Sequence, residues 1–87
     1  MSHYETRQAG ELLIKQAGTN LFESLDDNER TVLRFGMLPH VKTIEAEKAL
    51  LEQAPELLED FDKCDIARLL AVGAMEACNA SGKPMVV

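Results

Sequence analysis

The sequence predicts an all-α protein, a small bundle of four to five helices with short connections. Helix-forming residues dominate the 87-residue chain, and runs of β-branched residues are nearly absent. No segment alternates apolar and polar residues in the way that a half-buried strand does. The composition, 46% apolar and 28% charged, is typical of a globular chain rather than a disordered one. We expect a single helical domain over residues 1–81, followed by a C-terminal tail at 82–87.

The first helix is predicted from about His3 to Ala17. Ser2 and Glu5 have the spacing of a capping box, in which each residue bonds to the other's backbone N–H. Gly18 is expected to close this helix as a left-handed residue. The next five residues, 19–23, are expected to form no more than a single turn.

A second helix is predicted to begin at Ser24, whose hydroxyl is a favourable N-cap, and to reach about Leu38. Its inner face is expected to consist of Leu25, Val32, Leu33, Gly36 and Met37. Pro39 is expected to end it, because proline cannot continue a helical hydrogen-bond ladder.

Thr43 is the expected cap of a third helix. Pro55 interrupts the apolar pattern of that helix, which therefore either bends or breaks there. We favour a break, with one helix ending near Gln53 and another beginning with Pro55 in its first turn.

The last helix is predicted over 63–79, with Asp62 as its N-cap. Between Ile66 and Cys78 it is apolar on nearly every side, and only Arg68, Gly73 and Glu76 interrupt the pattern. A helix that is apolar all round must be covered all round, so it is either the centre of the bundle or half of a subunit interface. We expect a homodimer, and the residues assigned to self-association are Leu69, Val72, Gly73 and Glu76. Close packing within one chain is the other explanation of Gly73.

The acidic charge is concentrated in one segment. Residues 45–65 carry eight acids and two lysines, a net charge of −6. Residues 1–44 carry six acids and five bases, and residues 66–87 carry one acid and two bases, so these two segments cancel and the whole chain also has a net charge of −6. On one continuous helix, Glu45, Glu52, Glu56 and Glu59 would form a stripe. A solvated outer face is the ordinary interpretation. The functional interpretation is a docking surface for a protein partner with a basic surface.

Catalytic chemistry has no support in the residue pattern. His3 and His40 are isolated, and the five glycines are too dispersed for a phosphate-binding loop. Cys64 and Cys78 would lie about 21 Å apart on one helix, too far to bond, and are expected to be reduced. We therefore assign no catalytic residue, no metal ligand and no cofactor, and expect the protein not to be an enzyme.

We expect the protein to be a non-catalytic adaptor or modulator that binds another protein. Two alternative functions concern nucleic acids. Residues 25–38, a short connection and a helix from Ile44 have the outline of a helix-turn-helix. The second helix, however, carries Glu45, Glu47 and Glu52 with only Lys48 of basic charge, which is the wrong sign for contact with DNA. An inhibitor that mimics nucleic acid with spaced carboxylates is the other alternative.

The N-terminal residues lack the basic region and apolar stretch of a signal peptide. The longest apolar run is too short and too interrupted to span a bilayer. We therefore expect a cytoplasmic protein that does not enter a membrane.

Overall fold

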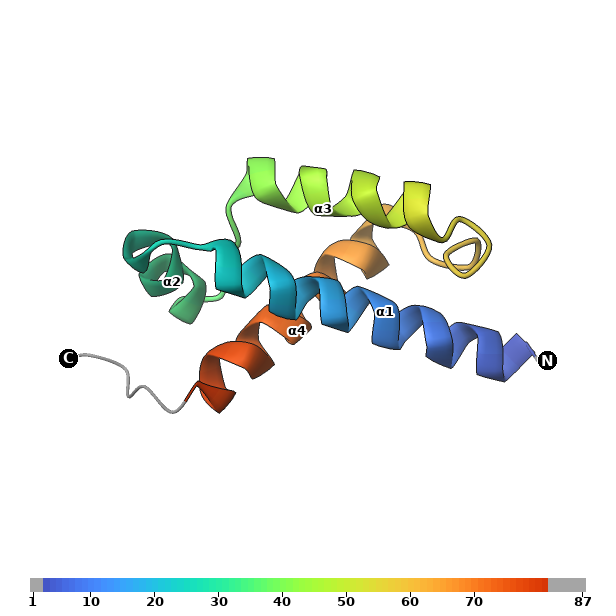
Figure 1. The fold of residues 1–87 in the computed structure, drawn as a ribbon, viewed down its shortest axis with the longest axis horizontal. Coiled ribbons are helices and arrows are strands. Elements are labelled where there is room, and N and C mark those ends of the chain that lie inside the picture. The colour runs from blue at the N-terminus through green and yellow to red at the C-terminus, as the bar shows by residue number, and fades with distance from the viewer. Residues whose placement is uncertain (1–2, 82–87) are drawn as a thin grey trace.

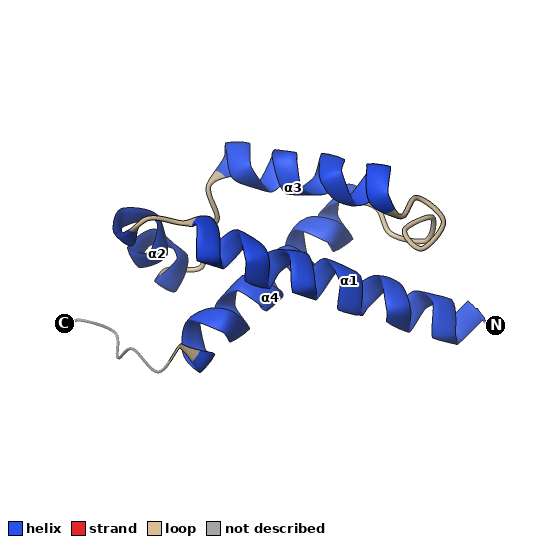
Figure 2. Cartoon of the chain, in the orientation of Figure 1, coloured by secondary structure: helices blue, strands red, loops and turns tan. Residues whose placement is uncertain are grey.

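The computed structural model describes residues 3–81, and every regular element in that range is a helix (Figures 1 and 2). This confirms the predicted small all-α bundle. α1 and α4 cross near the middle of the molecule, and α3 runs back along α1 in the opposite direction (Figure 1). The helices are α1 (His3–Ser24), α2 (Asp27–Arg34), α3 (His40–Gln53) and α4 (Lys63–Ala80).

α1 is longer than predicted. The expected end at Gly18 is wrong, because the helix continues through the predicted separate turn at 19–23 to Ser24. Gly18 is buried where α1 crosses α4, and a Cβ atom at this position would collide with the carbonyl oxygen of Leu70. The glycine therefore serves close helix packing. The predicted cap at Ser2 lies outside the described residues.

Asp26, and not Ser24, caps α2. The Asp26 carboxylate accepts the Glu29 N–H at 2.8 Å, and the Glu29 carboxylate accepts the Asp26 N–H at 3.0 Å, which completes a capping box. Ser24 is still part of α1, so its backbone cannot adopt the extended conformation of an N-cap. Its hydroxyl donates to the Leu21 carbonyl at 2.7 Å instead.

α2 ends at Arg34, four residues before the predicted end at Leu38. The chain turns at Gly36, which has a φ of +87° and is the only residue with positive φ between residues 3 and 81. This left-handed backbone is accessible to glycine at little cost. Because the helix stops early, Gly36 and Met37 lie beyond its end and are exposed rather than on an inner face. Val32 is also exposed, whereas Leu25 and Leu33 are buried as expected.

α3 begins at His40, so the predicted cap at Thr43 is also wrong. Pro39 occupies the N-cap position and offers no side-chain hydrogen bond. The Thr43 hydroxyl donates to the Pro39 carbonyl at 2.8 Å from within the first turn.

The predicted break before Pro55 is confirmed, since α3 ends at Gln53. No helix begins at Pro55, however, and residues 55–60 form successive turns. The Leu58 N–H donates to the Pro55 carbonyl at 3.3 Å, and the Phe61 N–H donates to the Leu58 carbonyl at 3.1 Å. Both apolar side chains are buried, so the turns bring them into the core.

The predicted N-cap of α4 is confirmed. The Asp62 carboxylate accepts the Asp65 N–H at 2.8 Å, and the Asp65 carboxylate accepts the Asp62 N–H at 3.3 Å. The helix extends to Ala80, one residue beyond the predicted end. The predicted tail at 82–87 lies outside the described residues.

The core consists of two apolar clusters, one on each side of the crossing between α1 and α4. The first is built around the middle of α1 and the start of α4, and the second around the end of α1, α2 and the end of α4. The first cluster contains Ile14, Leu50, Leu58, Phe61, Ile66 and Leu70. The second contains Leu21, Phe22, Leu25, Leu33, Ala74 and Cys78.

Within residues 66–78 the single chain leaves only one narrow stripe of α4 exposed, and the other ten residues are buried or half-buried, so the expectation of nearly complete coverage is confirmed except along that stripe. α1 crosses α4 instead of lying alongside it, and a groove separates α4 from α3. On the outer face Arg68, Val72 and Glu76 are exposed. The buried face consists of Ile66, Leu70, Gly73, Ala74 and Cys78.

Candidate interaction surface

α3 is held to the rest of the molecule along a narrow strip. Leu50 is its only buried side chain, and Ala46 is half-buried against the first cluster. Grooves flank the helix on both sides, one toward α1 and one toward α4. α3 thus supplies one wall to each of two surface concavities.

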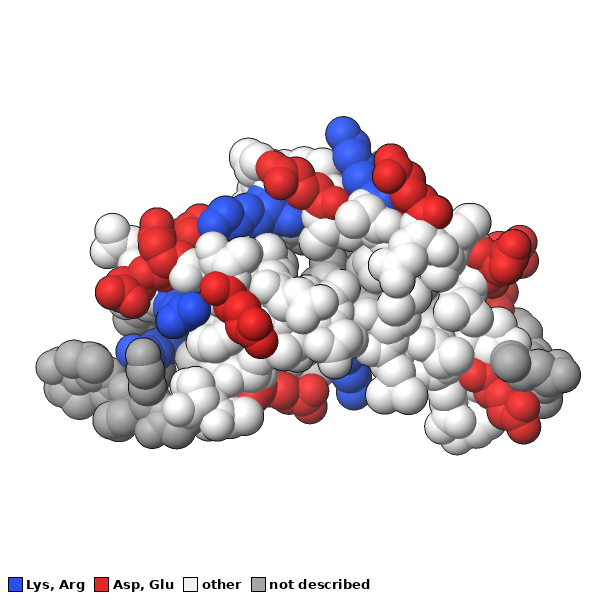
Figure 3. All heavy atoms as spheres, in the orientation of Figure 1, with Lys and Arg blue, Asp and Glu red and all other residues white. Residues whose placement is uncertain are grey.

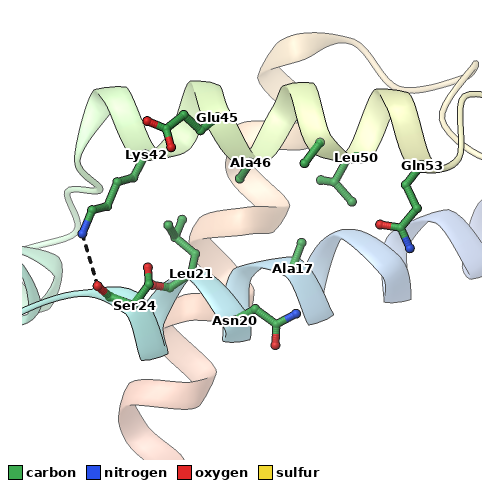
Figure 4. A pocket seen from close by; sticks show the side chains of 10 residues that line it. Ala17, Asn20, Leu21, Ser24, Lys42, Glu45, Ala46, Leu50 and Gln53 are labelled. Atoms are coloured by element: carbon green, nitrogen blue, oxygen red, sulfur yellow. Dashed lines mark hydrogen bonds between the residues drawn. The ribbon is translucent and has the colours of Figure 1, made fainter.

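The groove between α1 and α3 has a volume of about 500 Å³ (Figure 4). Its floor and inner walls are apolar, and most of the side chains there are small. Leu21 and Leu50 are buried at the bottom, whereas Ala49 is exposed on the α3 wall. The apolar lining consists of Ala17, Leu21, Ala46, Ala49 and Leu50.

Polar side chains form the rim of this groove. Lys42 reaches from α3 toward the end of α1, where its ammonium donates to the Ser24 carbonyl at 3.2 Å (Figure 4). Asn20 stands on the α1 wall, and Glu45 and Gln53 stand on the α3 wall.

The charge of Lys42 is already compensated within the chain. Its ammonium lies 2.8 Å from the Glu29 carboxylate, which also accepts the Asp26 N–H. The hydrogen bond from Lys42, followed by that from Asp26, holds the pKa of Glu29 below its usual value of 4.5. Glu45 is therefore the uncompensated charge on the groove rim.

The four glutamates predicted to bind a partner are all exposed, but they do not form one helical stripe. Glu45 and Glu52 share the outer face of α3, seven residues apart. Glu56 and Glu59 follow in the turns, because the helix has ended at Gln53. Across residues 3–81 none of the four forms an ion pair. Figure 3 shows carboxylates over α3 and over the turns beyond it, with lysines between them on α3.

The groove between α3 and α4 also has a volume of about 500 Å³, but its charge is mixed. Ile44 and Leu51 supply its apolar surface. Glu47 faces it together with Lys48 and Lys63, so the three formal charges sum to +1.

The residues predicted to mediate self-association do not lie on one exposed patch. Gly73 is buried against the backbone of Lys15 in α1 of the same chain. Leu69 packs partly against the first core cluster. Val72, at 37% exposure, and Glu76 face outward.

Sequence reasoning misses the α1 wall of the α1–α3 groove. It places Asn20, Leu21 and Ser24 in a turn or a cap, because Gly18 resembles a helix end. It also misses an exposed apolar corner between α2 and α3, where Phe35 is 78% and Val41 is 66% exposed. Residue type gives no local signal here, because the exposed Phe35 and Val41 are as apolar as the half-buried Leu38 between them.

Within residues 3–81 no three His, Cys, Asp or Glu side chains converge as a metal site. Cys64 is exposed, Cys78 is buried, and both are free thiols. None of the helices in this range is long and apolar enough to cross a bilayer. No protein-family model, curated protein or solved structure matches the chain.

Proposed function

We propose that the chain is a non-catalytic binding module, an adaptor or modulator that docks onto a basic surface of another protein. The carrying observation is the set of exposed carboxylates on α3 and in the following turns, Glu45, Glu52, Glu56 and Glu59, which have no ion-pair partner within residues 3–81. Uncompensated surface charge of one sign attracts a partner of the opposite sign and accelerates association.

The placement of the basic residues supports this assignment. The Lys42 ammonium pairs with Glu29, and the Arg30 guanidinium lies over the Phe22 ring at 4.7 Å. Arg7 lies in the same way over Phe61, at 4.6 Å. These cations are engaged within the fold, and only Lys48 and Lys63 lie in the same segment as the carboxylates, so residues 45–65 keep an excess of six negative charges.

The sign of this charge argues against direct contact with DNA. α2, the turn at residues 35–39 and α3 retain the outline of a helix-turn-helix. An α3 helix entering a DNA groove would bring Glu45, Glu47 and Glu52 against phosphates. These carboxylates could instead occupy the basic surface with which a partner binds nucleic acid. An inhibitor that mimics nucleic acid is therefore one form of the proposed binding module.

Self-association through the outer face of α4 belongs to the same proposal. Val72 lies there between Arg68 and Glu76, two opposite charges eight residues apart. In a two-fold dimer with antiparallel α4 helices, these charges would face each other reciprocally. The proposed setting is the cytoplasm, where the two free thiols are the expected state.

The acidic surface is tested by affinity capture from the native cell with two matched double variants. Glu52→Lys with Glu56→Lys reverses the proposed surface, and Glu23→Lys with Asp27→Lys reverses two exposed acids that lie outside both proposed interfaces. Each pair changes the net charge from −6 to −2 (−6 + 4). At roughly 50 mM salt, the first pair should fail to capture the partner, whereas the second pair should still capture it. The wild-type protein should capture less of the partner at roughly 300 mM salt than at roughly 50 mM, because salt screens the attraction. Equal capture by both pairs would remove the acidic surface from consideration.

A further inference from the structure

We infer that the groove between α1 and α3 binds an amphipathic helix that has a narrow apolar stripe and basic flanks. This inference rests on the proposed function and names the structural element that the partner would present. Helix-in-groove docking is a recurring mode of peptide recognition, in which apolar side chains at i, i+3 or i+4 and i+7 enter the groove.

The walls of the groove suit a helical occupant. α1 and α3 run in opposite directions, and both present small side chains to the space between them (Figure 4). Ala17, Ala46 and Ala49 have no atoms beyond Cβ, so a third helix can approach to the short interaxial distances of packed helices. Leu21 and Leu50 lie at the bottom, where apolar anchors of the occupant would be buried.

The length of the groove matches a short helix. Its α3 wall extends from Lys42 to Gln53, which corresponds to about 17 Å along the helix axis. This length accommodates about three turns of an occupant, enough for three apolar anchors.

The charge at the rim of the groove favours an occupant with positively charged side chains. Glu45 is exposed and unpaired at the rim, and Glu52 shares its outer face on α3. Lys42, the only cation of the lining, is compensated by Glu29. The opposite wall offers the neutral Asn20 and Ser24. Basic residues flanking an apolar stripe complement this rim, whereas the α3–α4 groove, with Lys48 and Lys63, does not favour them.

The probe for this inference is a synthetic eighteen-residue amphipathic peptide of Leu, Ala and Lys, and its control has Glu in place of Lys. Amide chemical shifts of the isotope-labelled full chain are followed during titration. The Lys peptide should produce saturable shifts in residues 17–24 and 42–53, and the Glu peptide should not. Absence of saturable shifts with the Lys peptide would overturn the inference, and so would shifts confined to the α3–α4 groove.

Two substitutions of equal size discriminate between the grooves. Ala49→Phe fills the α1–α3 groove and should weaken the Lys peptide at least about tenfold, because its ring occupies the volume of the bound helix. Ala67→Phe fills the α3–α4 groove and should leave the affinity unchanged. Asn20→Phe, from the opposite wall, gives a second obstruction if the first variant is unstable. Unchanged affinity with folded Ala49→Phe or Asn20→Phe would refute the groove.

Failure of this inference is distinguishable from failure of the proposed function. Capture of a cellular partner that is lost with Glu52→Lys and Glu56→Lys but retained with Ala49→Phe would keep the acidic surface and exclude the groove. Shifts in the groove residues that grow with protein concentration, without peptide, would identify a second copy as the occupant and overturn the inference.

Discussion

Gly18 of α1 and Gly73 of α4 face each other at the point where the two helices cross. A Cβ atom added to Gly18 would lie 3.1 Å from the Gly73 Cα atom, and one added to Gly73 would collide with the Lys15 carbonyl. Neither glycine has a positive φ. Space, rather than backbone conformation, therefore requires both residues, and the two core clusters form on either side of their contact.

Replacing Gly18 or Gly73 by alanine should lower the stability. In an ordinary helix the change from Gly to Ala stabilises by about 1 kcal/mol. Here the new methyl group would push the helices apart and loosen both clusters, so we expect a net loss of about 2–3 kcal/mol. For a domain of this size, each kcal/mol corresponds to about 4–8 °C in the melting temperature, which circular dichroism measures.

Gly36→Ala is the control for this pair. Gly36 is exposed, and a methyl group added there would meet no atom within 4 Å, so the substitution costs only the left-handed backbone, about 1–2 kcal/mol. A Gly18→Ala variant that melts at or above the wild type would contradict the close-packed crossing.

The capping residues give a second prediction. Asp26→Ala and Asp62→Ala each remove a side chain that accepts a backbone N–H at 2.8 Å, and each should cost about 1 kcal/mol of unfolding free energy. Thr43→Ala should cost less than about 0.5 kcal/mol, because Thr43 lies inside α3 and caps nothing. Urea unfolding of the three variants measures the difference, and an equal cost at all three positions would contradict the assigned helix starts.

The features that could be predicted from the sequence are those with an unambiguous local cause. Asp62 with Asp65 forms a capping box wherever the flanking residues are helical, and Pro55 disfavours helix at the residue before it. The role of Gly18 could not be predicted, because a buried glycine and a helix-closing glycine have the same local sequence, and only the approach of α4 distinguishes them. Asp26 with Glu29 has the same spacing as Asp62 with Asp65, but Ser24 is a competing cap two residues earlier, and only the continuation of α1 to Ser24 excludes it. The candidate groove depends on the same ambiguity: its α1 wall exists only because α1 continues past Gly18.

The Glu29–Lys42 pair makes stability depend on pH. The pKa of Glu29 is lower in the folded protein than its usual 4.5, so its contribution is complete above that value and is lost as the pH falls through the folded pKa. The difference in stability between the wild type and Glu29→Gln should therefore shrink as the pH is lowered from 6 to about 3. In a Lys42→Met background, which lacks the main hydrogen-bond donor to the Glu29 carboxylate, the same comparison should change less with pH. A pH-independent difference for Glu29→Gln would contradict the pairing.

α3 should open more readily than α1 and α4. It buries one side chain, has no side-chain N-cap and lies between two grooves. Local opening follows low burial, so its amides should exchange with solvent faster than those around Ile14 and Leu70. Hydrogen exchange followed by NMR measures this, with Leu50→Ala expected to accelerate α3 further. Equal protection across all three helices would contradict the loose attachment of α3.

The proposed dimer predicts about twice the chain mass of 9.6 kDa in sedimentation at micromolar concentration. Val72→Glu should shift the protein to monomer, because it replaces the one exposed apolar side chain between Arg68 and Glu76 on the outer α4 face with a carboxylate. Val41→Glu is the control: it adds the same charge at a more exposed valine on α3. A wild-type protein that sediments as a single chain would reject the dimer. A dimer that survives Val72→Glu and dissociates with Val41→Glu would move the interface to the apolar corner of α2 and α3, where the exposed Phe35 also lies.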